Sequence, residues 1–391
     1  MKKIKNIVII NDFNYIQGGA SKVAIDTANL LSNEYNVYFF CGDSKQSSTL
    51  KKNIKLICTN QGEALKDKNK LRGIINGIYN FKAKKELKKV LLTLDRNETI
   101  IHVHGWTKCL SSSVFDISWK LNFKLVLTMH DYFTACPNGG YFNYKKNEIC
   151  KLKPLSWKCI KCNCDSRNYA FKIYRIIRQF VQNKIVKLNS RIENVITISK
   201  LSEDILKQTL SKNVKIFRVN NPVDFDQHIQ NDNFTKNDYY LNVSRLTKEK
   251  NVDLFCEAVT RAKKNAIVAG AGPEKNRLQK KYPNIKFVGW KNGDEIKLLM
   301  KKAKYLVFTS NLYEGSPLTT MEALLMKLPC IVWSGCAAKE QIIEGENGFI
   351  YNNVDDLYNI LVSKELKKFK FDYNYNYYKK ITSVYKEIVG E

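Results

Sequence analysis

The sequence predicts an α/β protein built from two doubly wound domains. Its 391 residues suit two domains of ordinary size. Short apolar runs rich in β-branched residues alternate with helix-length amphipathic stretches along the whole chain, which is typical of repeated βα units. The apolar runs are continuous rather than alternating with polar residues, and this indicates parallel strands that are covered on both faces.

The composition excludes several classes of protein. With 44% hydrophobic and 12% aromatic residues the chain is too apolar for a disordered protein. The 65 basic residues exceed the 37 acidic residues, which gives a net charge of +28. This charge points to an anionic partner, either nucleic acid, phospholipid or a small anionic substrate. A compositional bias towards lysine and asparagine, without functional meaning, explains the charge equally simply.

The beginning of the chain predicts a buried strand rather than a targeting segment. The apolar run Ile7–Ile10 follows several lysines but ends at Asn11, so it is shorter than the roughly 7–15 apolar residues of a signal peptide. No run approaches the roughly 18 apolar residues of a membrane span. We therefore expect a cytoplasmic protein whose 11 cysteines are mostly reduced.

The first predicted domain comprises residues 1–220 and is Rossmann-like. Its predicted strands are Asn6–Asn11, Val37–Cys41, Ile54–Cys58, Thr99–His104, Lys124–Thr128 and Asn194–Ile198. The helices expected between and after these strands are Ala20–Ser32, Ile74–Leu94, Leu110–Lys120, Tyr169–Leu188 and Leu201–Leu210.

A second Rossmann-like domain is predicted for residues 221–371, after a polar linker at residues 220–238. Its predicted strands are Tyr239–Ser244, Ala266–Gly270, Lys286–Val288, Tyr305–Thr309 and Cys330–Trp333. Ligands of open α/β sheets bind beyond the carboxyl ends of the strands. Two such domains would therefore face each other across a central cleft, and residues just after strands are the best candidates for a site.

The segment that follows the strand Tyr305–Thr309 is the strongest candidate site. Ser316 suits the N-cap of a helix and Pro317 its first position. The free amides of that first turn would bind a phosphate or the oxygens of a sugar. Glu314 before the helix and Glu322 within it could contact two ends of one long ligand. A capping loop with a solvated glutamate is the alternative interpretation.

Three weaker motifs also follow strands. Arg245 and Lys250 flank a turn from which both could reach one diphosphate, although two solvated cations would leave the same pattern. Gly18 and Gly19 allow backbone amides to approach a phosphate closely, or simply form a turn. The glycines of Gly270–Pro273 are interpreted as shaping a turn.

In this order the four motifs resemble the retaining glycosyltransferases of family 4, the glycosyl transferases group 1, which have the GT-B fold. The resemblance runs along nearly the whole chain and is strongest over Tyr239–Tyr351. It implies transfer of a sugar, with retention, from a nucleotide-sugar donor such as a UDP- or GDP-sugar. The implied acceptor is a glycan or a lipid-linked molecule in the biosynthesis of a capsule, O-antigen or exopolysaccharide. It also implies that catalysis requires no cofactor.

The resemblance also implies roles for individual residues. The catalytic residues would be His130, Glu314, Arg245 and Lys250, where the two cations stabilise charge on the leaving diphosphate. The donor would be bound by Gly18, Gly19, Gly315, Ser316, Pro317, Leu318 and Glu322. Residues 1–220 would bind the acceptor and residues 221–371 the donor, and the C-terminal helix, residues 372–391, would pack back onto the first domain.

A cysteine-rich insert is predicted at residues 131–168. Four of its thiols have spacings that suit a closed structural zinc site, namely Cys136, Cys150, Cys159 and Cys162, with Cys164 as an alternative ligand. Free thiols or a redox-active pair are the alternatives.

A basic stretch follows the insert. Lys172–Arg191 contains six Lys and Arg residues and no acid, at spacings that place several on one helical face beside Phe171, Tyr174 and Phe180. The resemblance implies that this face meets an anionic membrane peripherally, on the inner side of the cell membrane. A solvated basic face is the alternative.

Two rival functions remain open at this point. A nucleotide-sugar epimerase can have the same two-domain fold. A basic nucleic-acid-binding protein with a zinc knuckle would also explain the charge, but it would leave the motifs of the second domain unexplained, and we expect no nucleic-acid partner.

Overall fold

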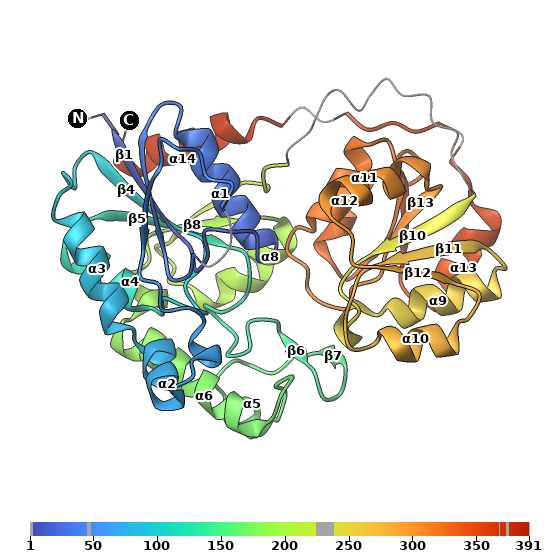
Figure 1. The fold of residues 1–391 in the computed structure, drawn as a ribbon, viewed down its shortest axis with the longest axis horizontal. Coiled ribbons are helices and arrows are strands. Elements are labelled where there is room, and N and C mark those ends of the chain that lie inside the picture. The colour runs from blue at the N-terminus through green and yellow to red at the C-terminus, as the bar shows by residue number, and fades with distance from the viewer. Residues whose placement is uncertain (1–2, 45–47, 224–237, 367, 373–374, 391) are drawn as a thin grey trace. The chain divides into compact units, whose positions relative to one another are not determined.

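The computed structural model describes two compact units, each containing one open parallel sheet (Figure 1). The described residues are 3–44, 48–223, 238–366, 368–372 and 375–390. The first unit consists of residues 1–141, 151–222 and 376–391, and the second of residues 142–150 and 223–375. The predicted α/β class is confirmed. Most of the predicted linker, residues 220–238, lies outside the described residues.

The first unit contains a seven-stranded parallel sheet with the strand order β3-β2-β1-β4-β5-β8-β9. Its strands are β1 (Asn6–Ile10), β2 (Asn36–Cys41), β3 (Lys55–Cys58), β4 (Thr99–Val103), β5 (Lys124–Met129), β8 (Asn194–Thr197) and β9 (Lys215–Arg218). The order reverses between β1 and β4, which is the point at which open α/β sheets bind ligands. The last strand, β9, was not predicted, because its two ends are exposed and only its two central residues are half-buried, as at the edge of a sheet.

Continuous burial explains why the central strands are parallel. Every residue of β4 is buried, and Ile7–Ile10 of β1 are entirely inaccessible to solvent. A strand that is buried on both faces is largely apolar, and a buried polar residue in it, such as His102, needs hydrogen-bond partners. A parallel sheet covered by helices on both sides provides that environment. This confirms the interpretation of the first apolar run as a buried strand.

Nine α-helices are described in the first unit. They are α1 (Gly19–Leu31), α2 (Lys70–Ile78), α3 (Phe81–Leu91), α4 (Ser113–Lys120), α5 (Trp157–Lys161), α6 (Tyr169–Phe180), α7 (Leu188–Arg191), α8 (Lys200–Leu206) and α14 (Tyr377–Val389). The last of them comes from the end of the chain and lies against the first unit. The hydroxyls of Tyr377 in α14 and Thr27 in α1 are 2.8 Å apart.

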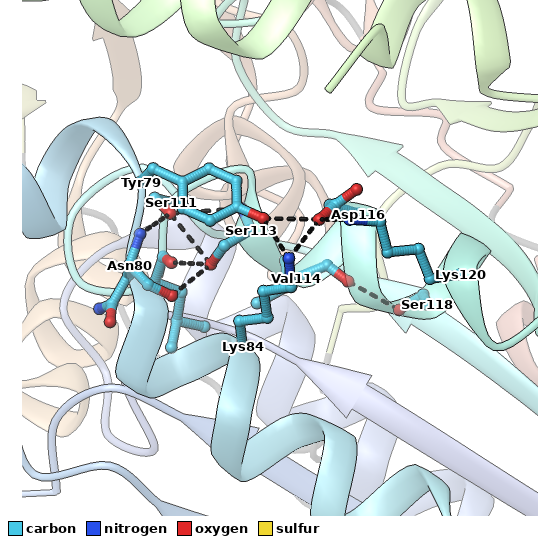
Figure 2. A network of polar contacts seen from close by, with 10 residues as sticks. Tyr79, Asn80, Lys84, Ser111, Ser113, Val114, Asp116, Ser118 and Lys120 are labelled. Atoms are coloured by element: carbon cyan, nitrogen blue, oxygen red, sulfur yellow. Dashed lines mark hydrogen bonds and ion pairs between the residues drawn. The ribbon is translucent and has the colours of Figure 1, made fainter. Parts of the chain in front are cut away.

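The single long helix predicted for Ile74–Leu94 is two helices in the structure. Asn80 is buried, and its side chain accepts a hydrogen bond from the amide of Ala83, so it caps the start of α3. Figure 2 shows how the break is held, because the Asn80 amide donates to Ser111 and the Tyr79 hydroxyl donates to Asp116 at 2.5 Å. Asparagine favours the N-cap over the helix interior, so Asn80 indicated a helix boundary. The helical periodicity of the apolar residues on both sides of it led to the prediction of one helix.

The second unit contains a six-stranded parallel sheet with the order β12-β11-β10-β13-β14-β15. The strands are β10 (Tyr239–Val243), β11 (Asn265–Ala269), β12 (Lys286–Gly289), β13 (Tyr305–Phe308), β14 (Cys330–Trp333) and β15 (Gly348–Tyr351). The helices are α9 (Val252–Arg261), α10 (Lys275–Lys281), α11 (Gly293–Lys302), α12 (Leu318–Leu325) and α13 (Val354–Ser363). The strand order again reverses next to the first strand, between β10 and β13, so the candidate motifs of this unit follow the two strands at its switch point.

Part of the cysteine-rich insert forms a short antiparallel hairpin. It consists of β6 (Phe142–Asn143) and β7 (Glu148–Ile149). Its residues, 142–150, group with the second unit, whereas the rest of the insert groups with the first.

Candidate functional site

Glu314 and Lys250 form an ion pair at the carboxyl ends of neighbouring strands in the second unit. Glu314 lies in the loop between β13 and α12, and Lys250 ends a short 3₁₀ turn after β10. The hydroxyl of Ser310 also donates to the Glu314 carboxylate at 2.6 Å. Two residues that the sequence separates by 64 positions are thereby brought into one polar cluster.

The electrostatics of this cluster keep Glu314 ionised. Burial alone would raise the pKa of Glu314, but the Lys250 ammonium, the Ser310 hydroxyl and the nearby charge of Arg245 hold that pKa below its usual value. Arg245 itself is largely exposed and lies 3.8 Å from Glu249. The cluster therefore offers one exposed guanidinium and one half-buried ammonium to an anionic ligand.

Backbone contacts tie the two loops together. The hydroxyl of Thr309 donates to the carbonyl of Lys250 at 3.0 Å, and the amide of Asn311 donates to the carbonyl of Glu249 at 2.8 Å. The amide of Ala337, after β14, donates to the carbonyl of Glu314. Three successive strand ends thus fix the position of Glu314.

The helix after Glu314 begins one residue later than predicted. Pro317 occupies the N-cap with an extended backbone, and α12 starts at Leu318, so Ser316 precedes the cap. Proline has no side-chain acceptor, and its N-cap position makes no side-chain capping bond to the first turn of α12. Gly315 lies in the loop before the helix and Glu322 lies in its second turn. The amides of this turn remain suited to an oxygen-rich ligand.

Glycines shape the neighbouring turn, as the sequence predicts. A Cβ at Gly270 would lie 1.8 Å from the carbonyl oxygen of Ser244, and one at Gly272 would lie 2.3 Å from that of Leu246. Only glycine allows the loops after β10 and β11 to approach so closely.

In the first unit, Gly18 and Gly19 join β1 to α1. Gly18 is the N-cap of α1, has φ +139°, and a Cβ there would meet no atom within 4 Å. The helix has no side-chain cap. Its first amides can therefore donate hydrogen bonds to an oxygen of a ligand, although the geometry serves a simple turn as well.

His130 lies directly after β5 and contacts a second histidine. Nε2 of His130 is 3.0 Å from Nδ1 of His104, which follows β4. The ring of His104 is also 4.1 Å, centroid to centroid, from the ring of His102. His102 is completely buried, with its ring nitrogens 2.7 Å from the hydroxyls of Tyr385 and Thr128. From the sequence, only His130 was assigned to the site and His102 and His104 were interpreted as structural, so the contact between the three imidazoles was not predicted.

Burial keeps all three imidazoles neutral at physiological pH. It lowers the pKa of His102 to about 3, with a further contribution from His130. It lowers the pKa of His130 to about 4, and that of His104 lies well below the usual value, mainly because of burial.

Three further charged residues lie near His130 and were not predicted. Asp12, at the end of β1, accepts hydrogen bonds from the amides of Lys108 and Cys109 at 3.0 and 2.7 Å. Burial raises the pKa of Asp131 to about 6, although the Phe133 amide and the charge of Arg178 oppose the change. Their position after strand ends could have identified the two aspartates, but only the tertiary structure brings Arg178 close to them.

The loop after His130 is held by inward-pointing side chains from α6 to α7. Arg178 donates to the carbonyl of Pro137 at 3.0 Å, Gln182 to that of Phe133 at 3.1 Å, and Asn189 to that of Thr134 at 2.9 Å. Gln182 belongs to a π-helical turn that follows α6. The predicted basic face is therefore corrected in part, because Arg178 is buried and clamps this loop.

The cysteines of the insert surround a lysine. The ammonium of Lys172, which is inaccessible to solvent, lies 3.3 Å from Sγ of Cys164 and 3.5 Å from Sγ of Cys159. Burial would lower the pKa of Lys172, but these two thiols and that of Cys136 raise it above its usual value. An ammonium at this position repels a metal cation.

No group of three or more His, Cys, Asp or Glu residues in the described ranges is arranged to hold a metal ion. The predicted set of Cys136, Cys150, Cys159 and Cys162 is thus not assembled, and Cys150 groups with the other unit. None of the described cysteines forms a disulfide.

A surface cavity of about 400 Å³ opens at the carboxyl ends of β1, β2 and β3. Tyr15 and Gln17 line it from the loop before α1, Glu63 lines it from the segment that leads into α2, and Arg72 lines it from the first turn of α2. Charged residues at its rim pair with one another, as Arg72 does with Asp67 at 2.7 Å. Such a set of paired charges, amides and one phenol suits the hydroxyls of a sugar.

Comparisons with known proteins agree with this architecture. Residues 224–364 match the family model of the glycosyl transferases group 1. A search of curated proteins gives no significant match.

Solved structures similar to the whole chain share its fold at low sequence identity. Anabaena HepE in complex with UDP is 16% identical with a TM-score of 0.58, and the match covers 92% of this chain and 89% of HepE. The lipopolysaccharide outer core galactosyltransferase WaaB in its apo form is 17% identical with a TM-score of 0.62, over 98% and 99%. TarM of S. aureus, in a complex that contains UDP, is 13% identical with a TM-score of 0.58, over 99% and 96%. From the family match and the shared fold we conclude that the chain has the GT-B fold of these glycosyltransferases and that its residues 224–364 match the glycosyl transferases group 1.

Proposed function

We propose that this glycosyltransferase transfers a sugar, with retention, from a UDP- or GDP-sugar to a glycan or lipid-linked acceptor of a surface polysaccharide. Capsule, O-antigen and exopolysaccharide are the candidate products. The observation that carries the proposal is the cluster of Lys250, Glu314 and Arg245 beside the first turn of α12. The UDP found in the HepE and TarM complexes supports a nucleotide-sugar donor.

The cluster suits a diphosphate leaving group. Arg245 offers a forked donor from an exposed position, and Lys250 offers a compact charge whose orientation Glu314 fixes. Both cations would stabilise the negative charge that develops as the bond between sugar and diphosphate breaks, so no metal ion is required in this proposal. Glu314 would then contact the sugar and Glu322 the ribose, while His130 would form a hydrogen bond with the sugar.

Further donor-binding residues lie before or at the start of two helices. These are Gly18, Gly19, Gly315, Ser316, Pro317 and Leu318, as the resemblance implies, and all of them except Pro317 have a backbone N–H that can donate. Of these, Gly18 and Gly19 begin α1 and Leu318 begins α12, and helix N-termini bind phosphates and sugar oxygens.

We assign the acceptor to the cavity of the first unit. Gln17, Asp43 and Gln61 supply hydrogen-bonding groups of the kind that recognise sugar hydroxyls. Arg72 links this cavity to the exposed face of α2, because it lies in the first turn of the helix that carries the exposed Leu71, Ile74 and Ile75. A glycan in the cavity could therefore remain attached to a lipid beside α2.

An apolar patch on α2 and α6 supports contact with a membrane. We call this set the α2–α6 patch, and its exposed members are Leu71, Ile74, Ile75, Tyr169, Ile173, Ile177 and Phe180. The two helices pack against each other (Figure 1), because Gly73 and Gly77 face inwards and leave the isoleucines outside. Several exposed apolar side chains on two helices that pack together are typical of a binding surface.

The net charge of +28 favours an anionic membrane as the partner of this patch. No helix in the described part of the chain has both the length and the apolar character needed to cross a membrane. We therefore propose peripheral binding at the cytoplasmic face. Sedimentation with phosphatidylglycerol vesicles should be weakened by Phe180→Ser, whose side chain is 53% exposed, and left unchanged by Leu298→Ser, which is 52% exposed in the second unit.

Thermal unfolding in the presence of UDP, GDP, ADP and their sugars tests the donor site. A ligand at 100 times its Kd adds about 2.7 kcal/mol of stability, so a single matching nucleotide should raise Tm clearly. Product analysis with that donor and no acceptor then separates transfer from epimerisation. Conversion of the donor into another nucleotide-sugar would identify an epimerase, and stabilisation by nucleic acid alone would overturn the proposal.

A further inference from the structure

The hydrogen bond between His104 and His130 allows two arrangements of one proton. Nδ1 of His104 and Nε2 of His130 are 3.0 Å apart, and one of them must donate. In the first arrangement His104 donates, so its Nε2 is unprotonated and His130 carries its proton on Nδ1. In the second His130 donates, so His104 carries its proton on Nε2.

The environment of His104 favours one of these two proton arrangements. His104 is 2% exposed, and its Nε2 is buried without a hydrogen-bond partner among the described residues. The first arrangement leaves a lone pair unpartnered there, whereas the second leaves an N–H group unpartnered. Buried N–H groups without acceptors are the rarer of the two defects in folded proteins.

We propose that His104 is a positioning residue for His130: its Nδ1–H donates to Nε2 of His130 and holds His130 in the tautomer that is protonated on Nδ1. His130 then presents an N–H donor to a ligand and has no basic nitrogen available. If His130 contacts the donor sugar, which rests on the proposed function, it binds a hydroxyl oxygen of the sugar and does not remove a proton.

The contacts of His102 are consistent with this arrangement of the proton. Its two ring nitrogens are bound to Tyr385 and Thr128, so it offers no hydrogen bond to His104. Its ring packs on that of His104 at 4.1 Å and fixes the plane of the second imidazole. Because burial keeps all three rings neutral, no additional proton is present that would make both nitrogens of His104 donors.

NMR of the full chain with ¹⁵N-labelled histidine tests the tautomer directly. The sequence contains only four histidines, and single substitutions assign their signals. At pH 7.5 we expect Nε2 of His130 to have the shift of an unprotonated nitrogen and Nδ1 that of an N–H. An N–H signal at Nε2 of His130, or a doubly protonated ring, would overturn the proposal.

Two nearly isosteric variants extend the test to function. The amide of His104→Asn can donate as Nδ1–H does, whereas the carboxylate of His104→Asp can only accept. We expect His104→Asn to retain the tautomer and to keep kcat within about threefold, since one neutral hydrogen bond is preserved. His104→Asp should move the His130 proton to Nε2 and lower kcat by about tenfold or more, with a smaller effect on KM.

The outcomes separate this inference from the proposed function. If His130→Ala leaves transfer unchanged while the NMR signals agree with Nδ1 protonation, the proposed role of His130 fails and the tautomer assignment stands. If His130→Ala abolishes transfer but His104→Asp retains full activity with its proton on Nε2, the positioning role of His104 is wrong.

Discussion

The phenol oxygen of Tyr385 lies 2.7 Å from Nδ1 of His102, although 283 residues separate them in the chain. Tyr385 is in α14, near the end of the sequence, and His102 is in the centre of the first sheet. Both side chains are completely buried. The last helix of the chain therefore takes part in the same core that positions His104 and His130.

Removal of this contact should destabilise the first unit. In Tyr385→Phe the buried ring nitrogen of His102 loses its partner, so we expect the free energy of unfolding to fall by about 1–3 kcal/mol. Urea unfolding followed by tryptophan fluorescence would measure it. Tyr169→Phe, which removes an exposed hydrogen bond to the carbonyl of Ile160, should cost less than about 0.5 kcal/mol. Equal losses in the two variants would contradict the structural role of Tyr385.

The three buried imidazoles should make stability depend on pH. A histidine whose folded pKa is depressed contributes its full stability above the unfolded value of 6.5 and loses it as the pH falls towards the folded value. His102, His104 and His130 all act in this direction. Asp131 and Asp12 act in the opposite direction because burial raises their pKa values.

A substitution isolates the contribution of one ring. Between pH 6.5 and 5 the free energy of unfolding of His102→Gln should fall less steeply than that of the natural protein, by about 1.4 kcal/mol per pH unit. Urea titrations at several pH values measure both slopes. Parallel slopes would mean that His102 is protonated in the folded protein.

The pair of Lys250 and Glu314 should be required for transfer. Lys250→Ala and Glu314→Ala should each lower the rate by at least about tenfold, which corresponds to roughly 1.4 kcal/mol. Release of the nucleotide measures the rate. Lys280→Ala, an exposed lysine in α10, is the matched control and should behave as the natural protein. Normal turnover in both site variants would refute the assignment of the donor site.

Close packing of α2 on α6 gives a fourth prediction. A Cβ at Gly77 would lie 1.8 Å from the hydroxyl oxygen of Tyr174, so Gly77→Ala should destabilise the protein by about 1–3 kcal/mol. The double variant Gly77→Ala/Tyr174→Phe removes the clashing oxygen and should recover much of the loss. Urea unfolding measures these losses. If the losses in free energy of unfolding of the two single variants simply add in the double variant, the clash with the Tyr174 hydroxyl is not the cause of the destabilisation.

Elemental analysis of the purified protein shows whether the cysteine-rich insert binds zinc. With the Lys172 ammonium between Cys159 and Cys164, we expect far less than one zinc per chain and 11 titratable thiols after unfolding. One zinc per chain, lost together with thermal stability on chelation, would show instead that these thiols bind a metal.

Much of the fold could be predicted because local patterns match the final elements. The apolar runs that become β1, β4 and β10 are continuous and short, as buried parallel strands must be. The error in the helix predicted for Ile74–Leu94 arose because two local sequence signals, helical periodicity and an N-cap residue, compete there. Asn80 separates two helices because its backbone amide donates to Ser111 and its side chain donates to the carbonyl of Cys109, both in the loop before α4. A helical period alone does not show such partners.

The α/β class, the two sheets and the motifs at strand ends follow from local sequence patterns, because side-chain periodicity and glycine positions act within a few residues of each other. Which distant residues meet follows only from the folded structure. It paired Lys250 with Glu314, buried Arg178 and Lys172 within a helix that had been interpreted as a basic surface, and connected Tyr385 to His102. Such contacts depend on the order and register of the strands, because a parallel sheet brings the ends of strands together irrespective of their distance along the chain.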